Sequence, residues 1–145
     1  PWLGNPKIAM GAVCVPIIWQ YIGYHMLLFY ASAKSIPDQI YEAAKIDGAS
    51  PIRTAFSITI PLMRPIIEVC VILALIGSLK MFDIVYIMTA GQPMNLTQVP
   101  SLFMYQNIFY AYRYGYGSAI AIFIVLECLL FTVLIQAVFR TRREI

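Results

Sequence analysis

The chain has 145 residues, of which 61% are hydrophobic and 12% are charged, and its formal net charge is +3. Soluble domains are roughly half apolar and about a quarter charged, so this composition excludes an ordinary water-soluble protein and indicates lipid as the surrounding medium. The small, dispersed positive charge also argues against a nucleic-acid-binding protein.

The three cysteines, Cys14, Cys70 and Cys128, lie far apart inside apolar runs. Because no CxxC pair is present, we interpret them as small buried hydrophobic residues rather than as metal ligands or disulfide partners. The chain begins at Pro1, with neither an initiator methionine nor a signal peptide. We therefore expect it to be part of a longer protein with further N-terminal helices.

Residues 10–33 form the first predicted transmembrane span. A helix needs about 20 mostly apolar residues to cross the hydrocarbon core, and this run is long enough. Its most polar members are Gln20 and His25. Gln20, Tyr21 and Tyr24 share one sector of the helix, because their spacing is i, i+1 and i+4.

A polar, helix-breaking segment follows over residues 34–64. Ser35 and Asp38 match a capping box, in which a serine side chain caps a helix that carries an acidic residue three positions on. We expect this helix to run to about Asp47. It should stop at Gly48, since glycine can adopt the left-handed backbone conformation that ends a helix.

A second short helix is predicted to begin at Ser50-Pro51, because proline suits the first turn of a helix. Pro61 and Pro65 are expected to end it and to direct the chain into the next span. The segment should therefore form a helix–turn–helix that lies parallel to the membrane. An ordinary solvated loop that packs on its own helices is the alternative.

The second predicted span covers residues 66–90 and the third covers residues 117–139. Lys80 and Asp83 are three residues apart in the second span and could pair on one helix face. Glu127 lies near the centre of the third span, where an ionised group should face protein or water.

Basic residues mark the cytoplasmic side of a membrane protein. They gather in the 34–64 segment and in the tail: Lys34, Lys45, Arg53, Arg64, Arg140, Arg142 and Arg143. The 91–116 loop carries only Arg113. We therefore expect the 34–64 segment and the C-terminus inside the cell and the 91–116 loop outside.

The external loop is rich in aromatic side chains. They are Phe103, Tyr105, Phe109, Tyr110, Tyr112, Tyr114 and Tyr116. This pattern predicts an interfacial aromatic belt with a short helix that lies at the membrane surface. A platform on which sugar rings stack is the alternative interpretation.

A motif with fixed spacing lies within the 34–64 segment. It reads Glu42-Ala43-Ala44, three residues, Gly48, nine residues, then Ile58-Thr59-Ile60-Pro61. This motif resembles the EAA loop of bacterial ABC importer permeases, a cytoplasmic loop that docks onto a separate ATPase subunit. Only Ile60 departs from the family pattern, which has leucine before the proline.

The resemblance extends over nearly the whole chain. Residues 82–89 (FDIVYIMT), followed by Gly91-Gln92-Pro93, are similar to a stretch of the carbohydrate branch that ends in Thr-x-Gly-Gly-Pro. Residues 114–119 (YGYGSA) resemble the beginning of that branch's last span. The Phe-Asp-x-x-Tyr form is most similar to the first permease of maltose- or glycerol-phosphate-type importers.

This resemblance implies an all-α integral membrane fold, with three transmembrane helices and a cytoplasmic helix–turn–helix coupling loop. The chain would be the C-terminal part of a larger type I ABC importer permease domain. The residues that the resemblance assigns to ATPase docking are Glu42, Ala43, Ala44, Asp47, Gly48, Ala49 and Pro61.

The resemblance also implies partners and a mechanism. An external solute-binding protein would deliver a sugar, this chain and a second permease would form the path, and a dimer of ATP-binding subunits would drive alternating access. ATP and magnesium would bind to those subunits, since no G-x-x-x-x-G-K-[ST] loop is present here. We expect no catalytic residue, metal or cofactor in this chain, and a multi-pass location in the lipid of the bacterial inner membrane.

Residues of the substrate path follow from alignment with the maltose-type permease at residues 34–37. The candidates are Gln20, Tyr21 and Tyr24 in the first span, and Gly77, Ser78 and Met81 in the matching sector of the second. Tyrosines and amides offer sugars apolar faces and hydrogen-bond partners. Packing between helices is the alternative.

Two other functions remain open at this point. The chain could belong to an EAA-loop importer of another small solute, such as an amino acid or a phosphonate. It could also be a non-transporting membrane scaffold, or a fragment that has no activity alone.

Overall fold

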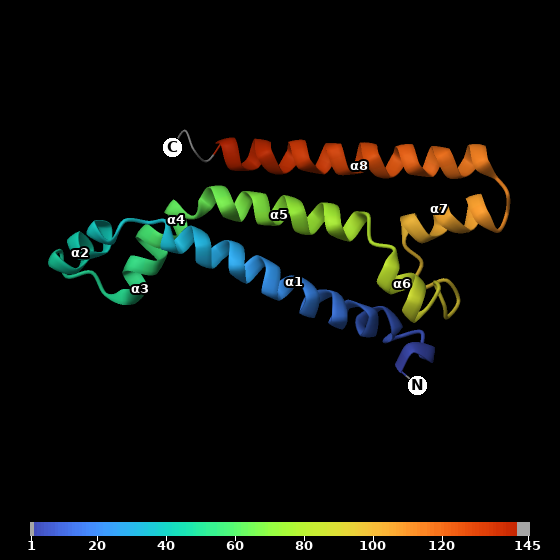
Figure 1. Ribbon diagram of the computed structural model, residues 1–145, viewed down its shortest axis with the longest axis horizontal. Coiled ribbons are helices and arrows are strands. Elements are labelled where there is room, and N and C mark those ends of the chain that lie inside the picture. The colour runs from blue at the N-terminus through green and yellow to red at the C-terminus, as the bar shows by residue number, and fades with distance from the viewer. Residues whose placement is uncertain (1, 142–145) are drawn as a thin grey trace. The chain divides into compact units, whose positions relative to one another are not determined.

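The computed structural model describes residues 2–141, and every regular element within that range is a helix. The long helices are α1 (Ala9–Lys34), α5 (Arg64–Leu79) and α8 (Tyr114–Thr141) (Figure 1). Three stretches are long and apolar enough to cross a membrane by length and composition: Ala9–Lys34, Arg64–Met88 and Tyr114–Phe139. The prediction of an all-helical protein with three spans is confirmed. Arg142 and Arg143, used to predict orientation, lie outside the described residues.

Short helices connect these spans. In chain order they are η1 (Trp2–Gly4), α2 (Asp38–Ile46), α3 (Pro51–Thr54), the π-helical η2 (Ala55–Thr59), α4 (Ile60–Leu62), α6 (Asp83–Met88) and α7 (Pro100–Phe109). The chain divides into two compact units. One unit is Ile22–Val71, and the other combines the residues up to Tyr21 with those from Ile72 onward.

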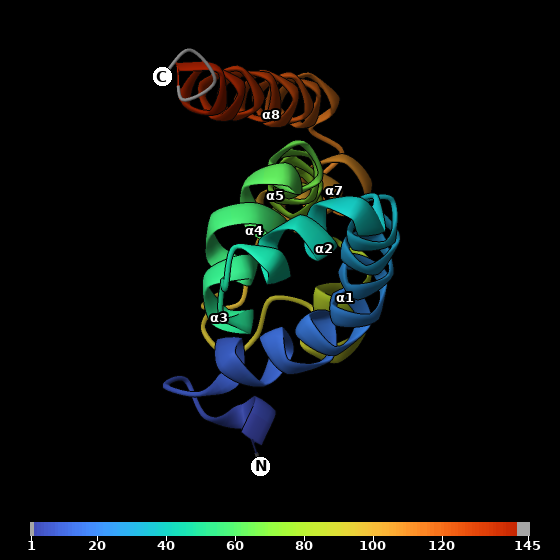
Figure 2. The same ribbon diagram turned by 90° about the vertical axis from the view of Figure 1, so that its left-hand side faces the viewer.

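The Ile22–Val71 unit contains the second half of α1, the helices α2 to α4 and the first half of α5. Within it, α2 and α3 fold back on one another (Figures 1 and 2). His25 Nε2 lies 3.3 Å from the backbone oxygen of Cys70, which joins α1 to α5. The Cys70 side chain is buried, as the sequence predicts for a small apolar residue, whereas Cys14 and Cys128 are only half-buried.

The other unit has a small apolar core. Its buried members come from α1, α6, α7 and the residue before α7: Val13, Val85, Leu102 and Val99. Met81 and Phe82 pack against this cluster from the connection between α5 and α6. The loop before α7 and the two short helices therefore fold onto the first half of α1.

The second predicted span is interrupted. Helix α5 ends at Leu79 and α6 begins at Asp83, so Lys80–Phe82 is not helical. Ser101 Oγ on α7 donates a hydrogen bond to the Met81 carbonyl oxygen, which supplies a partner to backbone that the helix leaves unpaired. The hypothesis of a Lys80–Asp83 pair is wrong: both residues are described and exposed, and no ion pair joins them. The i, i+3 spacing does not apply, because the helix breaks between them.

Helix α7 packs along the beginning of α8 (Figure 1). Gly117 makes this contact possible, since a Cβ atom there would lie 2.2 Å from Ile108 Cγ1. Any larger residue at position 117 would therefore force the Ile108 side chain, or α7 with it, to move. A short helix in the 91–116 loop was predicted and is present.

The turn between α6 and α7 is held by its own polar groups. Thr97 is fully buried, and its Oγ1 donates to the Gln92 carbonyl oxygen (2.9 Å). The same Thr97 oxygen lies 2.8 Å from Thr89 Oγ1. Gly91 adopts φ +91°, and a Cβ atom there would lie 3.3 Å from the Leu102 side chain. The positive φ favours glycine at this position, and a Cβ atom would also press on the Leu102 side chain.

Candidate functional site

The helix–turn–helix begins differently from the prediction. Helix α2 starts at Asp38 with Pro37 at its N-cap, and no side chain caps it. Ser35 Oγ instead donates a hydrogen bond to the Ser32 carbonyl oxygen (2.7 Å) at the end of α1. The predicted capping box is wrong, because Ser35 satisfies the preceding helix rather than the following one.

The end of α2 confirms the role predicted for Gly48. Gly48 has φ +71°, and its N–H donates to the Lys45 carbonyl oxygen (3.0 Å). The Ala49 N–H donates to the Ala44 carbonyl oxygen (2.9 Å). These two bonds form a Schellman motif, the commonest way in which a glycine reverses the chain after a helix.

The second helix begins as predicted. Ser50 is the N-cap, its side chain accepts a hydrogen bond from the Arg53 N–H (3.3 Å), and Pro51 takes the first helical position. Pro61 does not end the helix, which is a correction: helical structure continues to Leu62 and turns at Met63. The π-helical segment just before Pro61 explains this. In an α-helix the proline ring would clash with the carbonyl group four residues earlier, and the wider π-helical turn moves that carbonyl away.

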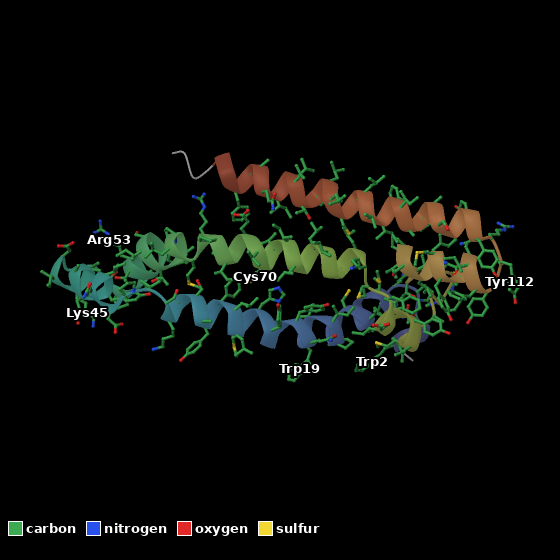
Figure 3. The ribbon with its side chains drawn as sticks, turned by 45° about the horizontal axis from the view of Figure 1, so that its top comes forward. Trp2, Trp19, Lys45, Arg53, Cys70 and Tyr112 are labelled. Atoms are coloured by element: carbon green, nitrogen blue, oxygen red, sulfur yellow. The ribbon has the colours of Figure 1, made fainter. Side chains whose placement is uncertain are left out.

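The two helices of the motif contact one another. Tyr41 Oη on α2 lies 3.4 Å from Thr59 Oγ1 on η2. A small cavity of about 270 Å³ lies between the helices, lined by Tyr41, Lys45, Ala49, Pro51, Thr54, Ala55 and Thr59. Figure 3 shows Lys45 and Arg53 on this motif, and both side chains are exposed.

Most residues proposed for docking are exposed. Glu42, Ala43, Asp47, Gly48 and Pro61 are on the surface, and Ala49 is half-buried. Ala44 is the exception, because only 5% of its surface is accessible. The motif therefore presents Ala43 but uses Ala44 for its own packing.

Three large, exposed apolar side chains on this motif were not among the residues predicted from the sequence. Ile46, Ile52 and Phe56 are 86%, 74% and 69% exposed, although they lie outside the candidate spans. Residues of this kind would ordinarily pack inward in a helix–turn–helix, so their exposure leaves an unusual amount of apolar area open on this motif. The sequence could have indicated them, because each is an isolated large hydrophobic residue in a polar segment.

The structure brings together some of the residues proposed for the substrate path. A Cβ atom at Gly77 on α5 would lie 3.3 Å from Tyr21 Oη on α1, so the glycine leaves room for the phenol. Gln20 and Ser78 are exposed, whereas Met81 packs against the apolar core. Tyr24 belongs to the Ile22–Val71 unit, where its ring meets His25 edge to face (5.6 Å between centroids). The roles of all six residues remain predictions.

The loop aromatics form a cluster with two residues that the loop pattern did not include. Tyr105 on α7 lies 5.0 Å from Phe82, 5.4 Å from Tyr86 and 5.8 Å from Tyr110, between ring centroids. The Tyr86 and Tyr110 hydroxyl groups are 3.3 Å apart. This hydrogen bond raises the pKa of Tyr110 to about 12, because it favours the neutral phenol.

A cavity of about 510 Å³ adjoins this cluster. It is lined by Tyr86, Ala90, Gln106, Asn107, Tyr110 and Ala111. These residues come from α6, the turn after it, α7 and the turn before α8. Sequence reasoning missed the cavity and Tyr86, because a pair of residues 24 positions apart carries no local signal.

The chain is similar to known proteins over almost its whole length. Residues 1–144 match the family model described as "Binding-protein-dependent transport system inner membrane component". A putative ABC transporter permease protein ORF1 from Caldicellulosiruptor sp. (strain Rt8B.4) is 44% identical over 142 residues, which are 97% of this chain and 99% of that protein. The trehalose/maltose transport system permease protein MalF of Thermococcus litoralis is 40% identical over 143 residues, 99% of this chain.

Two further comparisons concern length and fold. The sulfoquinovosyl glycerol transport system permease protein SmoG of Agrobacterium fabrum is 37% identical over 97% of this chain. The chain spans 46% of SmoG and 48% of MalF, which is about half of each. The crystal structure of a bacterial ABC transporter that imports the acidic polysaccharide alginate contains a chain with the same fold, with a TM-score of 0.85 at 24% identity over 97% of this chain.

Proposed function

Because the chain belongs to the family of binding-protein-dependent transport system inner membrane components, we propose that it works in a sugar importer driven by ATP. It is a multi-pass membrane protein and a transport subunit. In the proposal, sugar passes between this chain and a second permease, after delivery by an external binding protein. Two ATP-binding subunits on the cytoplasmic side hydrolyse ATP with magnesium, and this chain has no catalytic role.

One observation carries the proposal: the helix–turn–helix between two candidate spans displays Ile46, Ile52 and Phe56 to solvent. Nothing in the described part of the chain covers these side chains, and such a surface suits a protein partner. Glu42, Asp47 and Arg53 stand on the same motif and would give the contact its orientation. The motif lies between α1 and α5 in the chain. When an ATPase subunit bound to the motif moves as its dimer closes, the movement can therefore be transmitted to both helices.

A sugar is the proposed substrate because relatives of this chain are named as sugar transport proteins. MalF is named for trehalose and maltose, and SmoG for a sulfoquinovosyl glycerol. Tyr21, Tyr24 and Gln20 along α1 suit a polyhydroxyl ligand, since phenol rings can stack on sugar rings and amides can hydrogen-bond to sugar hydroxyl groups. Transport then requires two states of the path, one open to each side, which nucleotide binding to the partner biases through differential contacts.

The test uses the whole transporter in proteoliposomes, with its binding protein, second permease and ATPase. The probes are maltose, trehalose, arginine and 2-aminoethylphosphonate. We expect one or both sugars to stimulate ATP hydrolysis through the binding protein, and the other two probes to have no effect. Stimulation by arginine or the phosphonate alone would assign the transporter to another solute.

Phe56→Ala examines the docking surface in the same assay. Because Phe56 is mostly exposed, we expect the variant to fold normally but to bind the ATPase about tenfold more weakly, as for the loss of one apolar anchor at an interface. Leu129→Ala on α8 is the matched control, since Leu129 is also a large apolar residue, is 58% exposed and lies outside the motif. Equal ATPase binding by the two variants would contradict the docking role.

A further inference from the structure

We propose that the 510 Å³ cavity between α6 and α7 is a second saccharide subsite, which takes a neutral sugar ring on the external side of the permease. This inference rests on the proposed function. The cavity lies apart from the residues proposed for the path, since none of Gln20, Tyr21, Tyr24, Gly77, Ser78 or Met81 lines it. A sugar bound here would be held between its delivery and its passage into the spans.

The position of the cavity fits this use. Tyr86 stands near the end of the candidate span Arg64–Met88, and the other lining residues belong to the connection that leads to Tyr114. In the proposed orientation this connection faces outward, where a binding protein releases its cargo. The volume lies within the range of pockets that hold small molecules and suits one or two sugar rings.

The lining chemistry selects a neutral polyhydroxyl ligand. Two phenol rings provide apolar faces with hydroxyl groups, and Gln106 and Asn107 provide amides. Asn107 Nδ2 donates to the Phe103 carbonyl oxygen (2.8 Å), which leaves the side-chain oxygen available to accept from a sugar hydroxyl. None of the six lining residues is charged, so a carboxylate or phosphate ligand would lack a counter-charge. A uronic acid or sugar phosphate therefore fits less well.

The polar groups are held in place before any ligand arrives. Gln98 Nε2 donates to Gln106 Oε1 (2.7 Å), and Gln106 Nε2 reaches the Ala90 carbonyl oxygen (3.4 Å). The ring of Tyr86 stacks on Phe82 with 15° between the planes, at 5.2 Å between centroids. Groups that are already oriented lose less entropy on binding, which is the property expected of a recognition site.

Exposure distinguishes the cavity from an ordinary packed core. Tyr110 belongs to the aromatic cluster and yet is 64% exposed, so much of its side chain is open to a ligand. Tyr112 is also exposed, lies two residues further on and does not line the cavity (Figure 3). The two tyrosines therefore give a matched pair of variants that differ in their relation to the cavity.

The experiment uses the complete transporter in lipid nanodiscs, without binding protein. The probe is maltose that carries a photoreactive diazirine, and the comparison probe is glucuronic acid with the same group. We expect the maltose probe to label peptides within residues 86–111. Tyr110→Ala should lower this labelling about tenfold through loss of a hydroxyl and a ring face, and Tyr112→Ala should leave it unchanged.

Three results would overturn the subsite: equal labelling of the Tyr110→Ala and wild-type proteins, labelling only outside residues 86–111, or equally strong labelling by the glucuronic acid probe. A lipid that native mass spectrometry finds on the wild type and not on Tyr110→Ala would likewise assign the cavity to lipid. Sugar-stimulated ATP hydrolysis, measured on the same preparations with binding protein added, reports separately on the proposed function. Stimulation without cavity labelling removes the subsite alone.

Discussion

The two connections between candidate spans differ in how they treat their apolar residues. Each links two candidate spans through short helices and uses a glycine with positive φ, Gly48 in one and Gly91 in the other. In the connection 35–63, only Ala44 is fully packed, and Ile46, Ile52 and Phe56 face outward. In the connection 89–113, Val99, Leu102 and Thr97 are buried.

Charge separates the two connections as well. The first carries Asp38, Glu42, Lys45, Asp47 and Arg53, all of them exposed, whereas the second carries only Arg113. The second connection also leaves large apolar residues exposed, Met94, Phe109 and Tyr112 among them, but it buries apolar residues of its own and carries almost no charge. The first connection combines exposed apolar residues with exposed charges and buries almost nothing. We therefore expect the first connection to need a protein partner to cover its apolar side chains.

The largest expected effect concerns the side of the membrane. In a variant whose three cysteines are replaced by alanine, we introduce Ile46→Cys in one connection and Leu96→Cys in the other, both at exposed positions. A membrane-impermeant maleimide applied to intact cells should label position 96 and spare position 46, because basic residues keep the first connection inside. Labelling of both positions, or of position 46 alone, would remove the basis of the comparison.

The next effect concerns stability. Leu102 is fully buried in the core of the second connection, so Leu102→Ala should lower the free energy of unfolding by about 2–5 kcal/mol through lost contacts and a residual cavity. Thermal unfolding of the purified transporter in detergent measures this. Ile46→Ala is the control, since it removes an equally large side chain from an exposed position and should change stability little. Similar losses for the two variants would show that the first connection is also a packed element.

The smallest effect concerns the turn of the helix–turn–helix. A valine at Gly48 must adopt φ near +71°, which costs about 1–2 kcal/mol for an ordinary residue. We expect Gly48→Val to reach the membrane but to lose most of the sugar-stimulated ATP hydrolysis, since α2 can no longer end in its Schellman motif. Gly48→Asn should retain far more stimulation, because asparagine tolerates the left-handed region. If valine and asparagine behave alike, the turn does not set the coupling.

Some features of this protein are determined by short stretches of sequence. The three spans follow from runs of apolar residues, since the length needed to cross lipid is fixed. Gly48 and Ser50-Pro51 likewise predict the turn of the helix–turn–helix, because the left-handed conformation and the proline restart involve only neighbouring residues. The EAA spacing falls on this same local structure.

Other features depend on contacts between residues far apart in the chain, and only the tertiary structure shows them. At the break over Lys80–Phe82, the Met81 carbonyl finds its partner in Ser101, twenty residues away. Ala44 and Ala43 are identical in sequence terms, yet only packing between α2 and its neighbours buries the first of them. The aromatic cavity requires Tyr86 and Tyr110 to meet across 24 residues. Contacts of this kind follow from how helices pack and leave no periodic trace in the chain, whereas hydropathy and backbone preference act within a few residues.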